Sequence, residues 1–222
     1  MKRSTLMFLF FIVLVLTLSP AYAAPVTFAD RTAWQTALGG PVSFSVDFNS
    51  YSVDTYFNTA PLDIGPFTMS SIGSAPSDRN LVDVPPYNVP GSGVDGTPDM
   101  EIYVEGALMA SMAFDVPINA WFGDFYAAGN GLPLMITLIS SSGSSDIFVP
   151  GIGNDYVSFG FIDTGAQYTQ IILSNTVNDG FSLDNIDGGQ AGQVSVPEPA
   201  TVLLLCSGLA GLIFGRKMSM RR

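Results

Sequence analysis

Residues 42–48 of this chain read VSFSVDF, and their apolar and polar side chains alternate strictly. Because successive side chains of a β-strand point to opposite faces, an alternation of period two predicts a strand with one buried face. Turn-forming clusters, such as residues 128–131 and 141–144, separate similar stretches farther along the chain. These stretches predict strands at residues 67–72, 101–104, 108–114, 118–126, 134–139, 147–149, 156–162, 168–173 and 181–186. Many short strands joined by turn clusters predict a mainly β fold, a single jelly-roll-like β-sandwich.

One short helix precedes these strands. Asp30 is a favoured N-cap residue, Trp34 and Leu38 share one face of a helix, and a pair of glycines follows directly. This pattern predicts a helix over residues 31–38. Residues 74–98 are rich in Pro, Gly and Asp and predict a long surface loop with a weak strand at residues 81–84.

The N-terminus has the features of an export signal. Two basic residues are followed by the apolar residues 6–18 and then by a small-x-small motif formed by Ala21 and Ala23. An apolar segment this short, ending in a cleavage motif, predicts a removable signal helix rather than a retained membrane span. We therefore expect a signal peptide over residues 1–23.

The C-terminus predicts a membrane anchor. Pro197, Glu198 and Pro199 are followed by the apolar residues 200–214 and then by four basic residues. Fifteen helical residues span about 22 Å, which is short for a hydrocarbon core of about 30 Å. Basic residues favour the cytoplasmic side, so this transmembrane helix would hold the rest of the chain outside the inner membrane.

The order of these C-terminal features resembles the PEP-CTERM sorting signal of Gram-negative bacteria. The resemblance covers residues 196–222 and implies that an exosortase, a membrane transpeptidase, recognises Pro197, Glu198 and Pro199. It also implies release of the preceding domain to the cell surface or to an exopolysaccharide matrix. An ordinary tail anchor is the alternative.

Residues 24–195 would then form the passenger domain. Their sequence resembles PEP-CTERM passenger domains in the phrases at residues 46–48 (VDF), 120–125 (AWFGDF) and 179–186 (DGFSLDNI). The last phrase is similar to the final strand of sugar-binding jelly-roll modules. The resemblance implies a sandwich fold, and fold alone does not define a ligand.

The charge of this domain excludes one class of partner. Residues 24–195 contain eighteen carboxylates and only two basic side chains, Arg31 and Arg79, which gives a formal charge of −16. Such a surface repels phosphate, so we expect no nucleic-acid partner.

The residue types present also exclude most catalytic arrangements. The chain contains no histidine, its two lysines lie at the termini, and its one cysteine, Cys206, lies in the tail. Ser-His-Asp, Cys-His and Ser-Lys arrangements are therefore impossible in residues 24–195. We expect a non-catalytic protein, with a carboxylate-based glycosidase as the less favoured alternative.

Carboxylate and amide oxygens without histidine or cysteine suit Ca²⁺. Asp47 lies on the polar side of an early strand and Asp184 lies in the last one. In the sugar-binding modules that this chain resembles, a structural calcium often joins such strands, and Asp179, Asn185 and Asp187 are candidates for further ligands. The alternative is that these residues only cap turns and a strand edge.

The aromatic residues of the strand expected at residues 118–126 are candidates for sugar contacts. Alternation places Trp121 and Phe125 on one face and Phe122 and Tyr126 on the other. We take Trp121 and Phe125 as the candidate sugar platform, with core packing as the alternative. The expected function is carbohydrate binding or a structural role in an extracellular polysaccharide, and the alternative is a surface adhesin acting through protein contacts.

Overall fold

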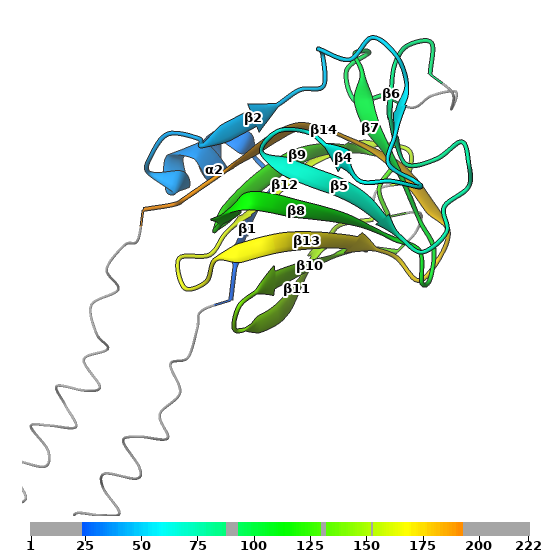
Figure 1. Cartoon of the computed structure of the whole chain (residues 1–222). Coiled ribbons are helices and arrows are strands. Elements are labelled where there is room, and N and C mark those ends of the chain that lie inside the picture. Colours follow the sequence, from blue (N-terminus) through cyan, green and yellow to red (C-terminus); the bar gives the residue numbers. More distant parts are fainter. Residues whose placement is uncertain (1–23, 88–92, 130–131, 152, 193–222) are drawn as a thin grey trace, which may run out of the picture. The chain divides into compact units, whose positions relative to one another are not determined.

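The computed structural model describes residues 24–87, 93–129, 132–151 and 153–192. All of them belong to the compact unit Met1–Gly192, and the second unit, Gln193–Arg222, lies outside the described residues. Two antiparallel sheets pack face to face, with β9 and β14 in one layer and β8 and β13 in the other (Figure 1). The prediction of a mainly β sandwich with one short helix is confirmed.

The first sheet, sheet A, has eight strands in the order β1-β12-β9-β14-β7-β6-β3, and β2 also pairs with β14. Every pair within it is antiparallel. Its strands are β1 (Val26–Phe28), β2 (Phe44–Val46), β3 (Thr55–Tyr56), β6 (Leu81–Asp83), β7 (Asp99–Val104), β9 (Ala120–Tyr126), β12 (Tyr156–Ile162) and β14 (Asp179–Gly189).

The second sheet, sheet B, has six strands in the order β11-β10-β13-β8-β5-β4. Its strands are β4 (Leu62–Asp63), β5 (Phe67–Ile72), β8 (Met109–Ile118), β10 (Leu134–Ser140), β11 (Gly143–Val149) and β13 (Tyr168–Ser174). Their pairing is antiparallel throughout.

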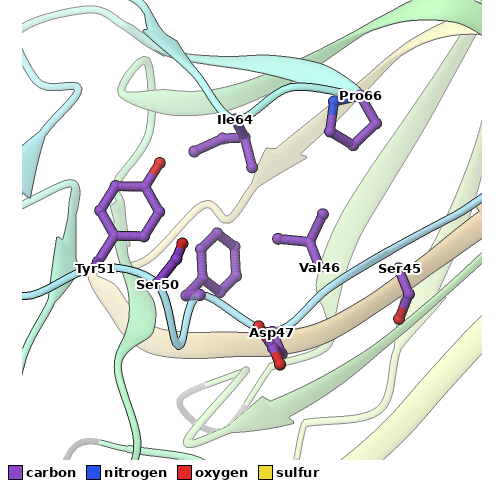
Figure 2. Close-up of a pocket in the computed structure, with 8 residues that line it drawn as sticks. Ser45, Val46, Asp47, Ser50, Tyr51, Ile64 and Pro66 are labelled. Carbon is purple, nitrogen blue, oxygen red and sulfur yellow. The ribbon is translucent and has the colours of Figure 1, made fainter.

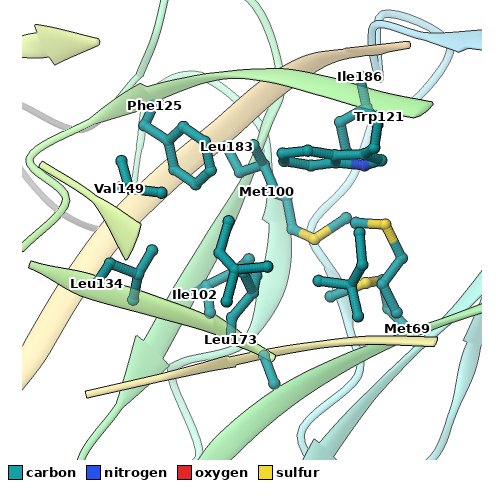
Figure 3. Packing of buried hydrophobic residues seen from close by; sticks show 14 of the residues in the cluster. Met69, Met100, Ile102, Trp121, Phe125, Leu134, Val149, Leu173, Leu183 and Ile186 are labelled. Atoms are coloured by element: carbon teal, nitrogen blue, oxygen red, sulfur yellow. The ribbon is translucent and has the colours of Figure 1, made fainter. Parts of the chain in front are cut away.

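Apolar side chains from the facing sides of both sheets form one core. Figure 3 shows Trp121, Phe125 and Leu183 of sheet A opposite Leu134 and Leu173 of sheet B. All five side chains are fully buried. Burial of apolar surface stabilises the fold by about 25 cal/mol per Å², so this core is the main reason why the two sheets stay together.

The helix α2 (Arg31–Leu38) covers part of the outer face of sheet A. Asp30 caps it by accepting a hydrogen bond from the Ala33 N–H at 2.7 Å, and Gly39 ends it with a left-handed φ of 67°. Trp34 packs on Phe122, with ring centroids 5.5 Å apart. A small second core therefore forms between the helix and β9.

Several boundaries differ from the predicted ones. The serine cluster after β10 forms a tight hairpin in which Ser140 pairs with Gly143, so β11 begins at Gly143, four residues earlier than expected. The short strands β1, β3 and β4 escaped prediction because two or three residues carry too little pattern. The weak strand predicted at residues 81–84 is the strand β6, which pairs with β3 and β7.

Among the described residues, no helix combines the length and the apolar character needed to cross a bilayer. The predicted signal peptide, with Ala21 and Ala23, and the predicted helix at residues 200–214 lie outside the described residues.

Candidate functional site

Four aspartates lie side by side on the outer face of sheet A. The register places Asp99 of β7 opposite Asp83 of β6, and Asp184 of β14 opposite Asp124 of β9. The ladder between β7 and β14 ends at the pair Met100 and Leu183. Asp99 and Asp184 are the next residues on these two strands, so the two aspartate pairs lie next to each other. Directly opposite side chains on one face of a sheet have Cβ atoms about 4.5–5.5 Å apart. We call these four residues the aspartate row.

Asp99, at the centre of the aspartate row, is fully buried. Burial raises its pKa to about 7, and the charges of Asp83 and Glu101 act in the same direction. The Val94 N–H, which donates to Oδ2 at 3.0 Å, and the Ser182 hydroxyl lower the pKa but do not compensate for burial. The other oxygen, Oδ1, has no hydrogen-bond partner among the described residues.

Asp184 has the same character. It is fully buried, and its Oδ2 has no hydrogen-bond partner among the described residues. Burial raises its pKa to about 7, the charges of Asp95, Asp99 and Asp47 raise it further, and the Asn185 N–H lowers it. At neutral pH, therefore, the centre of the aspartate row holds on average less than its full negative charge.

Both arginines of the described chain bind carboxylates of this same face. Arg79 forms an ion pair with Glu101. Arg31 forms ion pairs with Asp124, at 3.0 Å, and with Asp187. Since no lysine or histidine occurs in the described residues, these two ion-paired arginines are their only cationic side chains.

A second row lies one pleat away on the same face, with tyrosines at both ends. At one end, Tyr126 and Tyr156 are cross-strand neighbours with ring centroids 4.8 Å apart, and Tyr156 is 56% exposed. At the other end, Tyr56 is 40% exposed. The register runs through Tyr56, Leu81, Glu101, Ser182, Tyr126 and Tyr156. We call these residues the tyrosine row.

Gly93 and Val94 lie across the middle of both rows. The Gly93 N–H donates to the Ser182 hydroxyl at 3.3 Å, and the Tyr156 hydroxyl donates to the Gly93 carbonyl at 3.0 Å. Together with the contact of Val94 to Asp99, these hydrogen bonds cover the polar centre of the face. The Tyr126–Tyr156 pair remains accessible beside it.

The proposed sugar platform of Trp121 and Phe125 is wrong. Both side chains are fully buried between the sheets, with ring centroids 6.0 Å apart (Figure 3), and neither can contact a ligand there. The opposite face of β9 is the outer face of the sheet, and only its C-terminal end is accessible. Phe122 lies beneath the helix α2, whereas Tyr126 belongs to the tyrosine row.

The five candidate calcium ligands do not form one cluster. Asp47 is exposed and follows β2, which pairs with β14, and its charge acts on Asp184, so these two lie near each other. Asp179 lies five residues along β14 from Asp184, about 17 Å away, and Asp187 is bound by an arginine. The Asn185 carbonyl accepts a hydrogen bond from the same arginine at 2.6 Å. Within the described ranges, no three acidic side chains converge tightly enough to hold a metal ion.

A pocket of about 340 Å³ lies beside Asp47. Figure 2 shows Val46 and Ile64 approaching each other from its two walls, with Tyr51 to one side and Pro66 above. Asp47 is the only charged residue in its lining. Ser45, Ser50 and Tyr51 add hydroxyl groups, so this pocket is polar but carries one carboxylate where the outer face of sheet A carries several.

Sequence reasoning missed the residues that this face brings together. The sequence placed Tyr126 on the face of its strand opposite Trp121 and Phe125, and it placed Tyr156 at the start of another predicted strand. Nothing in the sequence indicates that these two tyrosines are neighbours. The aspartate row draws its members from four strands, and the outermost two of them in sequence, Asp83 and Asp184, are about a hundred residues apart. Because register between distant strands is set by the folded sheet, no local pattern reveals it.

Comparison with known proteins identifies the tail. Residues 195–222 match the PEP-CTERM protein-sorting motif, which confirms the predicted sorting tail that contains Pro197, Glu198 and Pro199. This motif implies export and a C-terminal membrane anchor. No curated protein matches the chain.

Solved structures with similar folds are carbohydrate-binding modules and parts of glycoside hydrolases. A variant family 29 carbohydrate-binding module complexed with mannohexaose is 14% identical, with a TM-score of 0.37, over 66% of this chain and 99% of the module. A two-module fragment of xylanase 10B from Clostridium thermocellum, complexed with xylohexaose, is 11% identical, with a TM-score of 0.40, over 71% of this chain and 30% of the other. The catalytic unit of an α-1,3-glucanase from Streptomyces thermodiastaticus is 14% identical, with a TM-score of 0.36, over 61% and 28%. With TM-scores this low, a ligand has to be inferred from the residues of this chain itself.

Proposed function

We propose that this chain is an exported, exosortase-processed protein of the cell surface or exopolysaccharide matrix, and that its sandwich binds carbohydrate without catalysis. The observation that carries the proposal is the Tyr126–Tyr156 pair on the outer face of sheet A. Its rings lie next to polar groups that are already fixed by the sheet.

The chemistry of this pair suits a sugar ring. A pyranose presents an apolar C–H face and a polar rim, so a protein that binds it needs an aromatic surface next to hydrogen-bonding groups. Tyr156 and Tyr126 supply the surface, and the Tyr156 hydroxyl is already held by the Gly93 carbonyl at 3.0 Å. Ser158 and Asp124, which bond to each other at 2.7 Å, lie one pleat away on the same two strands.

Binding to a glycan array tests the proposal. Full-length protein in detergent is expected to give saturable binding to one or a few glycans, and Tyr156→Ala is expected to lower the affinity about tenfold by removing the stacking surface. Phe148→Ala is the matched control, because Phe148 is 54% exposed on β11 of the opposite sheet. An array without saturable signals, or equal losses in the two variants, would contradict carbohydrate binding at this site.

A surface adhesin that acts through protein contacts is the alternative within the same location. It predicts no saturable glycan signal and instead predicts that the protein, immobilised on beads, retains whole cells stripped of polysaccharide. The glycan array and this retention assay give opposite results for the two roles.

A glycosidase is a second candidate because Asp99 and Asp184 have pKa values raised to about 7. Carboxyl groups with raised pKa values often occur in active sites as general acids. Both residues are fully buried, and Val94 covers Asp99, which favours the binding role. Release of reducing sugar from a glycan that binds, abolished by Asp184→Asn, would establish the enzyme instead.

A further inference from the structure

Carboxylates lie near both ends of the tyrosine row. Asp155 precedes Tyr156 and accepts a hydrogen bond from its backbone N–H at 2.8 Å. At the other end, burial and the charges of Asp54 and Asp83 raise the pKa of Tyr56. A ligand that stacks on these rings therefore places its substituents close to negative charge.

No cation of this face is left for a negatively charged ligand. Arg79 is held by Glu101, and Arg31 by Asp124 and Asp187. These arginines are the only cationic side chains of the described residues. A uronic acid or a sulfated sugar would bring further negative charge to a face that has no free cation to neutralise it. Repulsion between like charges would then lower the affinity of such a ligand.

From these two observations we infer the class of glycan that this face binds: an amino-sugar polymer with free, protonated amino groups. The inference rests on the proposed carbohydrate binding and specifies its ligand. The Tyr126–Tyr156 pair takes the apolar face of a glucosamine residue, and the ammonium group lies toward Asp155. Exposed Asp95, whose charge also reaches Asp184, adds to the negative potential along the same face.

Two kinds of attraction favour this ligand over a neutral one. Hydrogen bonds from ammonium to carboxylate are roughly twice as strong as those between neutral groups. An ammonium group near a tyrosine ring gains a cation–π contribution as well. An N-acetylated sugar keeps the stacking surface but loses both contributions, because its amide carries no charge.

Calorimetric titration of the full-length protein in detergent tests the inference with four oligosaccharides of equal length: glucosamine, N-acetylglucosamine, glucose and galacturonate oligomers. At a pH at which the amines are charged, the glucosamine oligomer is expected to bind about tenfold more tightly than its N-acetylated counterpart, which is the effect of one charge-assisted contact. The galacturonate oligomer is expected not to bind. A lysine oligomer with the same number of charges serves as a probe of charge alone and is expected not to compete.

Two variants distinguish this site from general attraction between an acidic protein and a polycation. Tyr156→Ala is expected to lower the affinity for the glucosamine oligomer about tenfold, and Asp155→Asn is expected to remove most of the preference over the N-acetylated oligomer. Phe148→Ala and Asp115→Asn, at exposed positions of sheet B, are the controls.

The outcomes separate this inference from the function on which it rests. Equal or tighter binding of the glucose or galacturonate oligomer overturns the amino-sugar inference and leaves carbohydrate binding intact. Glucosamine binding that survives Tyr156→Ala, or that the lysine oligomer displaces, also overturns the inference, because charge alone then explains it. Failure of all four oligosaccharides to bind overturns both this inference and the proposed function.

Discussion

Asp99 and Asp184 show how a single residue can depend on the whole sheet. Each is an aspartate in a strand whose neighbours also carry aspartates, and each is fully buried with one oxygen lacking a hydrogen bond from the described residues. A buried, unpaired carboxylate loses much of its hydration energy, so the protonated form is favoured. The raised pKa values are the consequence, and they link the stability of the sandwich to pH.

The first prediction concerns Asp99. Its folded-state pKa of about 7 lies above the ordinary value, so the folded protein binds this proton more tightly than the unfolded chain does. The stability from this group is fully present below the ordinary aspartate pKa and is lost as the pH rises through 7. Each unit by which the pKa is raised corresponds to about 1.4 kcal/mol. Asp99→Asn, which stays neutral, is expected to melt at a higher temperature than the original protein at pH 8.

Thermal melts of the two proteins across this pH range check the prediction. The advantage of Asp99→Asn at pH 8 should disappear at low pH, where Asp99 itself is protonated. Asp115→Asn, an exposed position of β8, is the control and should follow the original protein at every pH. A melting temperature of Asp99→Asn that falls below the original at pH 8 would show that the carboxylate is stabilising and charged.

The second residue-scale prediction concerns Phe125. Because this ring is fully buried in the core, Phe125→Ala is expected to lower the free energy of unfolding by about 3–5 kcal/mol. Tyr156→Ala, at an exposed position, is expected to change it by about 0.5 kcal/mol or less. Urea unfolding of both variants measures the difference. Similar losses in the two variants would mean that the Tyr126–Tyr156 pair is part of the structural core.

At the scale of elements, the helix α2 is connected to sheet A by the ion pairs of its first residue as well as by its apolar face. Arg31 binds Asp124 on β9 and Asp187 on β14, and its guanidinium lies 4.6 Å from the centre of the Phe122 ring. Trp34 adds a hydrogen bond to the Phe161 carbonyl of β12 at 3.0 Å. The helix thus joins three strands and closes one end of the outer face.

Arg31→Gln tests this connection. The change leaves two partly buried carboxylates without their cation, so we expect a loss of about 1–3 kcal/mol in the free energy of unfolding, measured in urea. Asp30→Ala, which removes only the helix cap, is expected to cost about 1 kcal/mol. If Arg31→Gln lowers the free energy of unfolding no more than Asp30→Ala does, the ion pairs of Arg31 contribute no stability beyond that of the helix cap.

Calcium binding between the strands β2 and β14 remains a prediction. The pairing of these strands brings Asp47 near Asp184. Asp179 instead accepts a hydrogen bond from the Gly129 N–H, and Asp187 forms an ion pair with Arg31. A Ca²⁺ ion bound only to the folded state would stabilise it by about 2.7 kcal/mol at a hundredfold excess over its dissociation constant. Melts with calcium and with a chelator measure this, and Asp47→Asn should remove the difference. An unchanged midpoint would mean that the pair binds no calcium.

For the whole molecule, the prediction concerns the two terminal signals expected from the sequence. We expect mature protein from the surface of its host to begin at Ala24 and to lack the residues after the Pro197-Glu198-Pro199 motif, because signal peptidase and an exosortase each remove one end. Intact-mass measurement decides this. Glu198→Ala is expected to leave the full tail in the membrane fraction. A full-length C-terminus on surface protein would contradict processing by an exosortase.

The sequence by itself predicted the fold class, most strand positions, the helix with its cap and the sorting tail. Local patterns are sufficient for these features because alternation, capping residues and terminal motifs act within about ten residues. The ends of β5, β12 and the helix α2 agree with the predicted residues. The short strands β1, β3 and β4 were missed, since their formation depends on a neighbouring strand rather than on their own pattern.

The candidate site was decided by the tertiary structure alone. Sequence alternation separated Trp121 and Phe125 from Tyr126 but could not say which side faces the core, because both sides of β9 are aromatic. The sheet places the first pair inside and joins Tyr126 to Tyr156 of β12. It also aligns Asp83, Asp99, Asp184 and Asp124 from four strands. Register between distant strands is fixed only when the core forms, so the face that carries the tyrosines and the carboxylates exists only in the folded sheet.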